Sequence, residues 1–261
     1  MLIMIRNIHK NEIHLYSLII PESFEGFSLK KCAAFLTEVD VIRYSKLKVR
    51  EKKKELLASR VFLWTVLDRY LASKTSSTNF SIKKDTNGKP FLFLYNEYFP
   101  LYFNLSHTKG LVSCVVSLHQ PLGVDVEYMD RKNVCFIEEY LAPVEREKII
   151  RTQYADKASC LYELWTLKEA YLKADGRGLY VPLDSFGFVF DQKEEWDRPG
   201  ERIQIQFYNS IREQSSEQWS FRLFRPTPWH SLAVAVRMEA TPLLRSFSWG
   251  VDVLDSSRVR F

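Results

Sequence analysis

The stretch that most constrains the fold is residues 161–182, which read LYELWTLKEAYLKADGRGLYVP. Trp165, Glu169 and Lys173 recur every four residues, so on a helix they would share one face. Leucine and tyrosine residues between them supply apolar surface on the other faces. Glycine is the usual residue just past a helix end, so Gly176 predicts that the helix stops there. We therefore predict an amphipathic helix followed by a turn.

The polar face of this helix has two interpretations. Glu169 and Lys173 could form an exposed ion pair, which would stabilise the helix by only about 0.2–0.5 kcal/mol. They could instead face a functional site. The choice between the two depends on what the rest of the chain brings to that face.

Composition sets broad limits on the protein. The chain has 261 residues, of which 46% are hydrophobic and 26% are charged, as in an ordinary globular protein. The length fits one large domain or two domains of about 130 residues. The net charge of +5 favours an anionic partner, such as a phosphorylated small molecule, an acidic protein or a nucleic acid, without choosing among them.

Cysteine usage and apolar runs indicate the compartment. The four cysteines are widely scattered and form no C-x-x-C pair, so neither a zinc site nor a disulfide framework is indicated. No apolar run approaches the ~20 residues that would span a bilayer. Arg6 interrupts the first apolar segment too early for a signal-peptide core. We therefore expect a cytoplasmic protein with reduced thiols and no membrane segment.

Strands and helices are expected to alternate along the chain. Helical regions are predicted at residues 38–71, 130–154 and 161–175. Strands are predicted at residues 12–20, 102–105, 111–118, 122–127, 186–190, 203–208, 219–224 and 231–237, with a hairpin loop at 192–201. This order indicates an α+β fold in two similar halves, residues 1–121 and 122–261. A weak internal echo, in which a histidine precedes a strand at His107 and again at His230, is consistent with two halves.

Two acidic residues end one apolar strand. Asp125 and Glu127 are two positions apart, so their side chains project from the same face of a strand. Two like charges side by side repel each other unless a cation lies between them. Oxygen ligands at this spacing suit Mg²⁺, which often binds one or two carboxylates together with substrate phosphates. The alternative is an exposed strand edge with two ordinary acids.

Ser106 and His107 end another strand. Their side chains could donate hydrogen bonds to phosphate oxygens, although an isolated histidine is more often structural. The chain has no G-x-S-x-G motif and no G-x-x-x-x-G-K-[ST] loop, which argues against a serine hydrolase and a P-loop enzyme.

A basic run occupies residues 46–54, and Arg60 follows within an apolar stretch. Such a run is usually a solvated helix face. A buried arginine requires an anionic partner. Binding of nucleic acid by the basic run would be sensitive to salt, but it would leave Asp125, Glu127 and Glu169 without a role. We therefore expect no nucleic-acid partner.

In their order along the chain, these motifs resemble the 4′-phosphopantetheinyl transferases of the surfactin-synthetase-activating (Sfp) type. The resemblance covers residues 87–186. Each motif alone is weakly specific, and the ordered set is highly specific. The matching stretches are NGKP at 87–90, FNLSH at 103–107, PLGVDVE at 121–127, LWTLKEAYLK at 164–173 and GRGLYVPLDSF at 176–186.

The resemblance implies a fold and an activity. The family fold is a pseudo-dimer of two similar α+β halves, with the active site and coenzyme A between them. Its members use Mg²⁺ and usually act as monomers. They transfer the 4′-phosphopantetheine arm of coenzyme A to a serine of an acyl or peptidyl carrier protein and release adenosine 3′,5′-bisphosphate. The alternative is another Mg²⁺-dependent enzyme that acts on a phosphorylated nucleotide.

Roles are carried over residue by residue. The resemblance assigns Asp125, Glu127 and Glu169 to Mg²⁺, and Glu169 also to the base that activates the carrier serine. Lys173 and His107 are implied to assist catalysis by contacting phosphate groups.

The implied contacts with coenzyme A come from several stretches. Lysines fall near the pyrophosphate, a serine and a histidine fall on phosphate contacts, and one turn lies next to the adenosine. These residues are Lys168, Lys173, Ser106, His107, Gly88, Lys89 and Pro90. The chain departs from the family at the 3′-phosphate, where an arginine is usual. Lys54 aligns best there, with Arg60 as the alternative.

Overall fold

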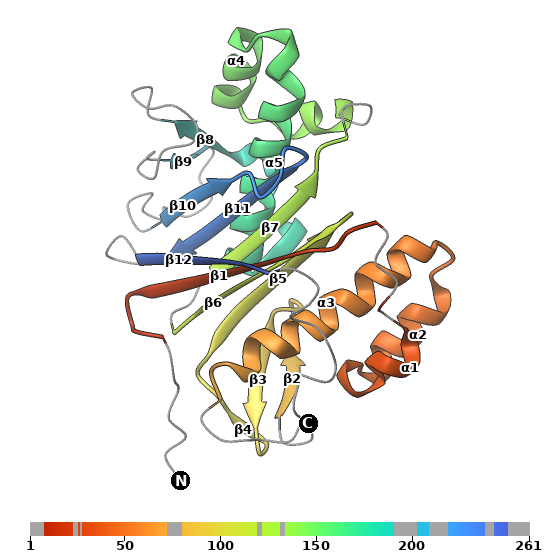
Figure 1. Ribbon diagram of the computed structural model, residues 1–261. Helices are drawn as coiled ribbons and strands as arrows, with labels where there is room; N and C mark the ends of the chain where they lie inside the picture. The colour runs from red at the N-terminus through yellow and green to blue at the C-terminus, as the bar shows by residue number, and fades with distance from the viewer. Residues whose placement is uncertain are drawn as a thin grey trace. The chain divides into compact units, whose positions relative to one another are not determined.

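The computed structural model describes residues 8–22, 26, 28–71, 80–118, 122–130, 134–190, 203–208, 219–237 and 243–249. Both helices and strands are present, which confirms the predicted α+β class (Figure 1). The chain forms two compact units. The described residues up to Asp85, residues Pro90–Leu118 and those from Leu244 onward belong to the first. Residues Thr86–Lys89 and the described residues from 122 to Leu243 belong to the second.

The first unit is built on a four-stranded sheet with the order β12-β1-β6-β5. Its strands are β1 (Glu12–Ile19), β5 (Tyr102–Thr108), β6 (Leu111–Ser117) and β12 (Leu243–Trp249). β6 pairs antiparallel with β1, from Ile13 opposite Ser117 to Ile19 opposite Leu111, and it also pairs antiparallel with β5. The strands predicted at 12–20 and 111–118 are therefore confirmed. β5 is longer than predicted because its pairing continues to Thr108.

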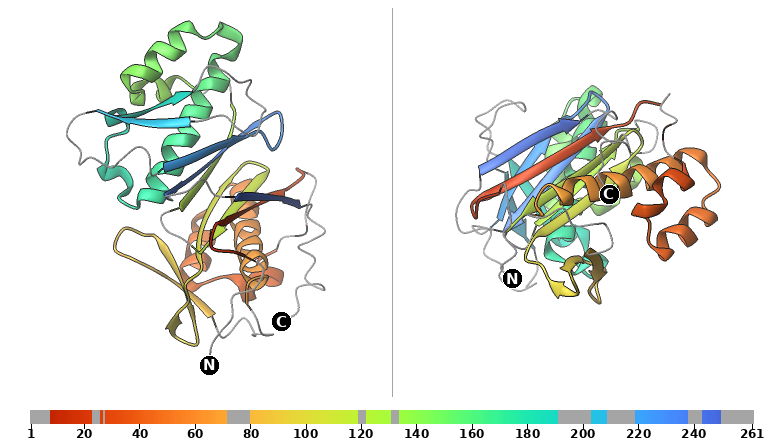
Figure 2. Two further views of the ribbon diagram at one scale, coloured as in Figure 1. Left: turned by 90° about the vertical axis from the view of Figure 1, so that its left-hand side faces the viewer. Right: turned by 60° about the horizontal axis from the view of Figure 1, so that its bottom comes forward.

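Helix α3 (Arg50–Asp68) packs against β5 and β6 (Figure 2). Ahead of it lie α1 (Leu29–Cys32), a 3₁₀ turn (Ala33–Phe35) and α2 (Glu38–Lys46). The prediction of a single helical region at 38–71 is wrong, because the region forms two helices. The backbone between them is extended at Leu47 and Val49.

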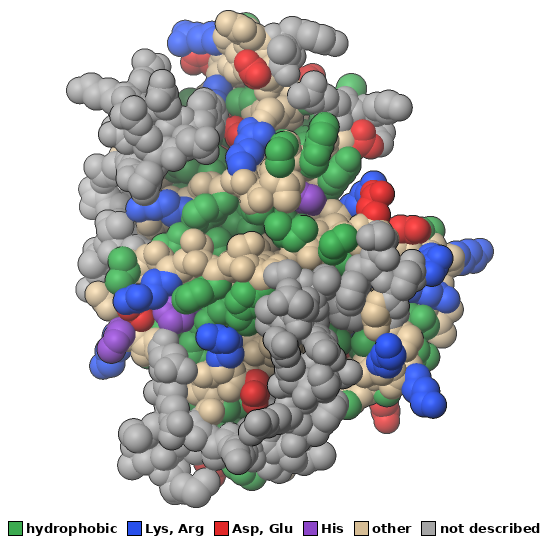
Figure 3. Space-filling model, viewed as in Figure 1, with side chains coloured by type: hydrophobic (Ala, Val, Ile, Leu, Met, Phe, Trp, Pro, Cys, Tyr) green, Lys and Arg blue, Asp and Glu red, His purple; other side chains and the backbone are tan. Residues whose placement is uncertain are grey.

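A capping box starts α2. The Thr37 hydroxyl accepts a hydrogen bond from the Asp40 backbone N–H (3.2 Å), and the Asp40 carboxylate accepts from the Thr37 N–H (3.1 Å). The Asp40 carboxylate also accepts from Arg60 Nε at 2.7 Å, which ties α2 to α3. Lys and Arg side chains gather on the part of this unit formed by α1, α2 and the start of α3 (Figure 3). The basic run is therefore an exposed or half-exposed face.

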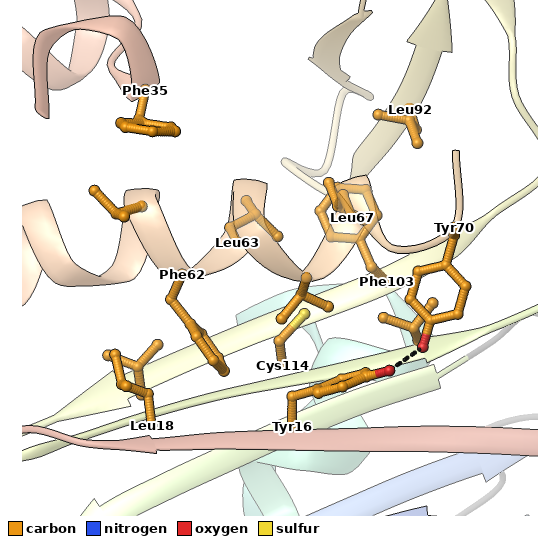
Figure 4. Close-up of a cluster of buried hydrophobic side chains, with 14 of the residues drawn as sticks. Tyr16, Leu18, Phe35, Phe62, Leu63, Leu67, Tyr70, Leu92, Phe103 and Cys114 are labelled. Atoms are coloured by element: carbon orange, nitrogen blue, oxygen red, sulfur yellow. Dashed lines mark hydrogen bonds between the residues drawn. The ribbon is translucent and has the colours of Figure 1, made fainter. Parts of the chain in front are cut away.

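The core of the first unit lies between α3 and the sheet (Figure 4). Tyr16 from β1 and Tyr70 just past α3 are both buried, and their hydroxyl groups are hydrogen-bonded at 2.8 Å. His14 Nδ1 is bonded to the same Tyr70 hydroxyl at 2.7 Å. These polar contacts satisfy groups that would be costly to bury alone.

A small sheet completes the first unit. It contains β2 (Phe80–Lys84), β3 (Pro90–Leu94) and β4 (Glu97–Tyr98). The turn predicted at 87–90 is confirmed, because it links β2 to β3 and Gly88 has a φ of 84°. That value lies in the left-handed region, which glycine adopts without a steric penalty.

The last described strand, β12 (Leu243–Trp249), does not lie in the half of the chain where a division between residues 121 and 122 would place it. The chain after Glu239 carries no clear periodic pattern, yet β12 lies next to β1 in the sheet of the first unit. Arg245 Nε donates to Glu12 Oε1 at 2.8 Å, and the Phe247 ring stacks on Tyr16 at 4.8 Å between ring centroids. Contacts with residues far apart in sequence therefore decide the place of this strand. The rest of the proposed division stays a prediction.

The second unit contains a three-stranded sheet with the order β10-β11-β7 and a two-stranded sheet of β8 and β9. Their bounds confirm the predicted strands: β7 (Leu122–Tyr128), β8 (Phe186–Phe190), β9 (Ile203–Phe207), β10 (Trp219–Phe224) and β11 (His230–Arg237). The hairpin loop predicted at 192–201 lies outside the described residues.

Helix α5 (Tyr154–Asp175) packs against β7 and β11 (Figure 2). It starts earlier than predicted and ends at Gly176, whose φ of 84° confirms the expected glycine cap. The helical region predicted at 130–154 is instead a 3₁₀ segment (Cys135–Tyr140) and α4 (Pro143–Arg151). None of the helices in the described ranges is long and apolar enough to cross a membrane.

Candidate active site

The close approach of α5 to β7 sets up the candidate site. A Cβ atom on Gly123 would lie 2.2 Å from the Ala170 carbonyl oxygen and 2.6 Å from the Ala174 nitrogen. Only glycine allows the strand to come so near the helix. Asp125 and Glu127 follow two and four residues later on the same side of β7, so this side faces α5.

The innermost carboxylate of the strand pairs with the helix. Asp125 is buried, and its Oδ1 atom lies 2.6 Å from Nζ of Lys173, whose side chain is 30% exposed. The lysine therefore forms an ion pair with the strand. This contact favours the second interpretation of the helix face, in which Lys173 belongs to a site.

Glu127 lies in a strongly acidic and partly dehydrated environment. Burial raises the pKa of this carboxyl to about 7, and the negative charges of Asp125 and Glu169 add to the effect. The Lys173 charge and a hydrogen bond with the Trp165 side chain act in the opposite direction. Near neutral pH, Glu127 is therefore poised between its protonated and ionised forms.

Glu169 experiences the same surroundings. Burial raises the pKa of its carboxyl, the Asp125 charge raises it further, and the Lys173 charge lowers it. Trp165, Glu169 and Lys173 thus all interact with acidic groups of β7, as the predicted shared face requires. Aromatic rings flank the Trp165 end of this face, with Phe136 at 5.3 Å and Tyr140 at 5.8 Å between ring centroids.

The donor atoms in this site suit a hard cation. Asp125, Glu127 and Glu169 offer carboxylate oxygens, the ligand type that Mg²⁺ prefers, and their mutual repulsion would be relieved by a divalent ion. Within the described ranges, however, no three His, Cys, Asp or Glu side chains are arranged to hold a metal ion. The positive charge nearest Asp125 Oδ1 is the Lys173 ammonium group. The residues therefore fit the metal by chemistry, and Mg²⁺ binding stays a prediction.

Lys168 requires a correction. Its side chain is 1% exposed, and Nζ contacts Glu145 Oε2 at 2.8 Å, the Leu183 carbonyl at 2.7 Å and the Phe186 carbonyl at 2.6 Å. An ammonium group has three protons, so these partners use all of them. We therefore remove Lys168 from the predicted contacts with pyrophosphate.

Residues 87–89 of the turn predicted to lie beside adenosine belong to the same unit as α5. Lys89 Nζ donates to the Ala174 carbonyl at 3.0 Å, near the C-terminal end of the helix where a cation is favourable. Gly88 forms the preceding turn, and Pro90 begins β3. Contact of these residues with adenosine stays a prediction.

Ser106 and His107 lie in the first unit, on β5. Ser106 is buried opposite Ser113 of β6. His107 Nδ1 is 3.9 Å from Oε2 of Glu55, a buried carboxylate of α3 that also pairs with Lys52 at 2.8 Å. Contact of Ser106 and His107 with phosphate groups stays a prediction.

The two candidates for the 3′-phosphate differ in their surroundings. Arg60 is paired with Asp40, so the anionic partner expected for a buried arginine lies inside the protein. Lys54 Nζ donates to the backbone carbonyls of Pro21 (3.0 Å) and Glu22 (2.9 Å). A carbonyl carries no net charge, so these two contacts do not cancel the positive charge of the lysine. Lys54 therefore stays the first choice for the predicted contact with the 3′-phosphate, with Arg60 as the alternative.

Two residues that shape the site were missed at the level of sequence. Gly123 lies within the stretch PLGVDVE at 121–127, and its role depends on the close approach of Ala170, which lies 47 residues further along the chain. Glu145 lies in the helical region predicted at 130–154 and had no predicted role. Its position three residues into α4, after Pro143, is a recognisable helix-start pattern, but its burial against Lys168 is not readable from sequence.

Comparisons with known proteins decide the family. The family model of the 4′-phosphopantetheinyl transferase superfamily (ACPS) matches residues 121–236, which include β7, α5 and β11. The transferase HetI of Nostoc sp. is 30% identical over 175 residues, which cover 65% of this chain and 70% of HetI. The chain belongs to the 4′-phosphopantetheinyl transferase superfamily.

Other relatives in this superfamily match shorter or less similar stretches. The 4′-phosphopantetheinyl transferase gsp of Aneurinibacillus migulanus is 34% identical over 108 residues, or 41% of this chain and 43% of gsp. The 4′-phosphopantetheinyl transferase Sfp of Bacillus subtilis is 27% identical over 176 residues, or 67% of this chain and 68% of Sfp. This transferase homologue therefore spans less than half of gsp and about two thirds of HetI and Sfp. The predicted resemblance to the Sfp type is confirmed.

Proposed function

We propose that this protein transfers the 4′-phosphopantetheine arm of coenzyme A to a serine of an acyl or peptidyl carrier protein, and that it depends on Mg²⁺. Membership of the superfamily supports the reaction class. The observation that carries the proposal is the meeting of Lys173 and Glu169 on α5 with Asp125 and Glu127 on β7. This arrangement gathers acids and a cation in one place, as transfer of a highly charged phosphate group requires.

The reaction balances without a covalent enzyme intermediate. The serine oxygen of the carrier forms a bond to the phosphorus that bears the pantetheine arm. The bond from this phosphorus to the bridging oxygen of the pyrophosphate breaks, and adenosine 3′,5′-bisphosphate leaves with the electron pair. The serine proton passes to a base, which raises the nucleophilicity of the hydroxyl group.

Each residue of the second unit has a proposed role. Asp125, Glu127 and Glu169 would hold Mg²⁺, which would neutralise charge on the phosphate oxygens. Glu169 would accept the serine proton, because burial and the Asp125 charge raise the pKa of its carboxyl and make it a better base than an exposed glutamate. Lys173 would move between Asp125 and the phosphate oxygens of coenzyme A.

The remaining expectations from the resemblance form part of the same proposal. They comprise a pseudo-dimer of similar halves with coenzyme A bound between them, contact of Ser106, His107 and Lys54 with phosphate groups, action as a monomer and a cytoplasmic location. The exposed basic face of α1, α2 and the start of α3 is consistent with an acidic carrier protein, which it would attract through long-range electrostatics.

The test is the intact mass of an apo carrier protein after incubation with the enzyme, coenzyme A and Mg²⁺. We expect the carrier to gain the mass of one phosphopantetheine arm, and we expect the gain to disappear with a chelator and to return when Mg²⁺ is restored. A carrier with alanine in place of the acceptor serine is the matched control. Absence of any gain across fatty-acid, polyketide and peptide-synthetase carriers would contradict the proposal.

A further inference from the structure

The Glu145–Lys168 ion pair is the most deeply buried charged contact described in the second unit. The Glu145 side chain is 0% exposed, the Lys168 side chain is 1% exposed, and Glu145 Oε2 lies 2.8 Å from Lys168 Nζ. Removing a charge from water is expensive, so a pair of this kind persists only when each group has further partners. Burial raises the pKa of Glu145 and lowers that of Lys168, whereas contact between the two opposes both shifts.

Each member of the pair is saturated by hydrogen bonds. Glu145 accepts from the backbone N–H groups of Ala142 at 2.8 Å and Phe188 at 3.1 Å. Lys168 donates to the carbonyls of Leu183 and Phe186. The pair therefore joins the start of α4, the middle of α5 and the chain segment 183–188, which includes the start of β8.

Packing around the pair leaves no space for adjustment. A Cβ on Gly187 would lie 2.7 Å from Ala142 Cβ and 3.3 Å from Cδ of Glu145. On the opposite side of α5, a Cβ on Gly123 would collide with the Ala170 carbonyl. The helix turn that contains Lys168 and Ala170 is thus held from two sides, by the ion pair and by β7.

Glu169 lies between these two contacts in sequence. Consecutive residues on an α-helix point about 100° apart, so the anchoring of Lys168 on one side fixes the direction of Glu169 on another. A small rotation or shift of α5 would move Glu169 and Lys173 relative to Asp125. Misplacement by about 1 Å can slow a reaction about 100-fold even when the substituted residue is distant from the chemistry.

We propose that Glu145 and Lys168 are positioning residues for the transfer reaction, which act by locking α5 to α4 and to segment 183–188 and touch no substrate. The inference rests on the proposed function. It assigns Glu145 a role and changes that of Lys168 from phosphate ligand to internal anchor.

The two roles for Lys168 predict different mutant patterns. An anchor is lost equally when either partner is changed, so Glu145→Gln and Lys168→Met should give the same phenotype. We expect each to lower kcat about 10- to 100-fold, while the Kd for coenzyme A measured by calorimetry changes by less than about threefold. A phosphate ligand would behave differently, because Lys168→Met alone would weaken coenzyme A binding.

The double variant Glu145→Gln/Lys168→Met is the decisive measurement. It leaves no unpaired buried charge, so we expect it to fold at least as well as either single variant. Its kcat should match that of the single variants, because residues that act as one unit are not additive. Glu147→Gln is the matched control, since Glu147 lies on the same helix in an exposed pair with Arg151, and we expect an unchanged kcat.

The outcomes separate this inference from the proposed function. Absence of transfer by the wild-type enzyme would remove the function and the positioning role with it. An active wild type together with a tenfold or greater loss of coenzyme A affinity in Lys168→Met, but not in Glu145→Gln, would overturn the anchor role. A double variant that folds and retains kcat within about twofold of wild type would show that the pair contributes stability without positioning the site.

Discussion

The ammonium nitrogen of Lys173 lies 2.6 Å from Oδ1 of Asp125 and so places the positive charge of α5 directly on the innermost carboxylate of β7. A metal ion held by Asp125 would compete with this lysine for the negative charge of the same carboxylate. The proposed movement of Lys173 towards phosphate would leave that charge to the metal. Binding of coenzyme A and of Mg²⁺ should therefore assist each other.

Replacement of Lys173 by methionine should separate metal binding from catalysis. Without the ammonium group, the three carboxylates lose their internal cation, so we expect Mg²⁺ to bind several-fold more tightly in calorimetry. The transfer rate should fall about 100-fold, because a charge that stabilises the departing phosphate is lost. Weaker Mg²⁺ binding in this variant would contradict competition between Lys173 and the metal.

Replacement of Gly123 by alanine should disrupt the site through packing alone. The new methyl group would overlap with the Ala170 carbonyl and must push β7 away from α5. We expect a loss of about 1–3 kcal/mol in the free energy of unfolding by urea, together with a large loss of activity.

Gly178→Ala is the matched control for this change. Gly178 has a φ of 59° and no atom near the added Cβ, so only backbone strain of about 1 kcal/mol is expected. Equal activity of the Gly123→Ala variant and the wild type would show that the close approach of strand and helix is unnecessary.

The raised pKa of Glu127 predicts a pH dependence of stability. The pKa of Glu127 is about 7 in the folded protein, whereas that of a solvent-exposed glutamate is 4.5. The folded state therefore binds the proton more tightly than the unfolded state. Stability should therefore fall as pH rises from 4.5 through 7, by about 3 kcal/mol at most, with the full loss present above pH 7. Urea unfolding at intervals between pH 4.5 and 8 measures this slope.

The Glu127→Gln variant should show a flatter profile across the same range, because glutamine does not titrate. Addition of Mg²⁺ to the wild type at pH 6 should release protons, because the metal favours the ionised carboxylate. An identical slope in wild type and variant would assign the pH dependence to other groups.

The choice between Lys54 and Arg60 can be tested with two substrates. Coenzyme A and its analogue without the 3′-phosphate differ only at the group in question. We expect Lys54→Gln to reduce the preference for coenzyme A, measured as the ratio of kcat/KM values, by about tenfold. Arg60→Gln should leave this ratio unchanged and lower the melting temperature, since it breaks the contact with Asp40. A change of the ratio in Arg60→Gln alone would reverse the assignment.

Replacement of Glu169 by glutamine should abolish transfer with little effect on folding. Glutamine keeps the shape of the side chain but can neither accept the serine proton nor supply a charged ligand. Intact-mass measurements of the carrier over time give the rate, and circular dichroism gives the fold. A rate near that of the wild type would exclude Glu169 as base and as essential ligand.

Local patterns predicted much of this structure correctly. The face shared by Trp165, Glu169 and Lys173, and the end of the helix at Gly176, follow from spacing and from one residue type with a strong backbone preference. The pairing of Asp125 with Lys173 follows less directly. This pairing requires β7 and α5 to pack together. Gly123 permits that packing, but no local sequence pattern predicts it.

The sequence-based errors have physical explanations. The resemblance implied a contact of Lys168 with pyrophosphate, and only tertiary structure shows that this lysine is buried with Glu145. The break between α2 and α3 at Leu47–Val49 was missed because neither glycine nor proline marks it. Contacts between distant segments thus override the ordinary exposure of a lysine at position 168.

The position of β12 has a consequence for folding during synthesis on the ribosome. Arg245 and Glu12, which join β12 to β1, are separated by 233 residues. At roughly 5–20 residues per second, about 10–50 s pass between the synthesis of the two strands. Throughout that interval the edge of β1 that β12 later covers is open, and an open edge can pair with another chain. The nascent first unit therefore stays open to misassembly while the second unit is being made, and slower translation of the second unit would prolong that exposure.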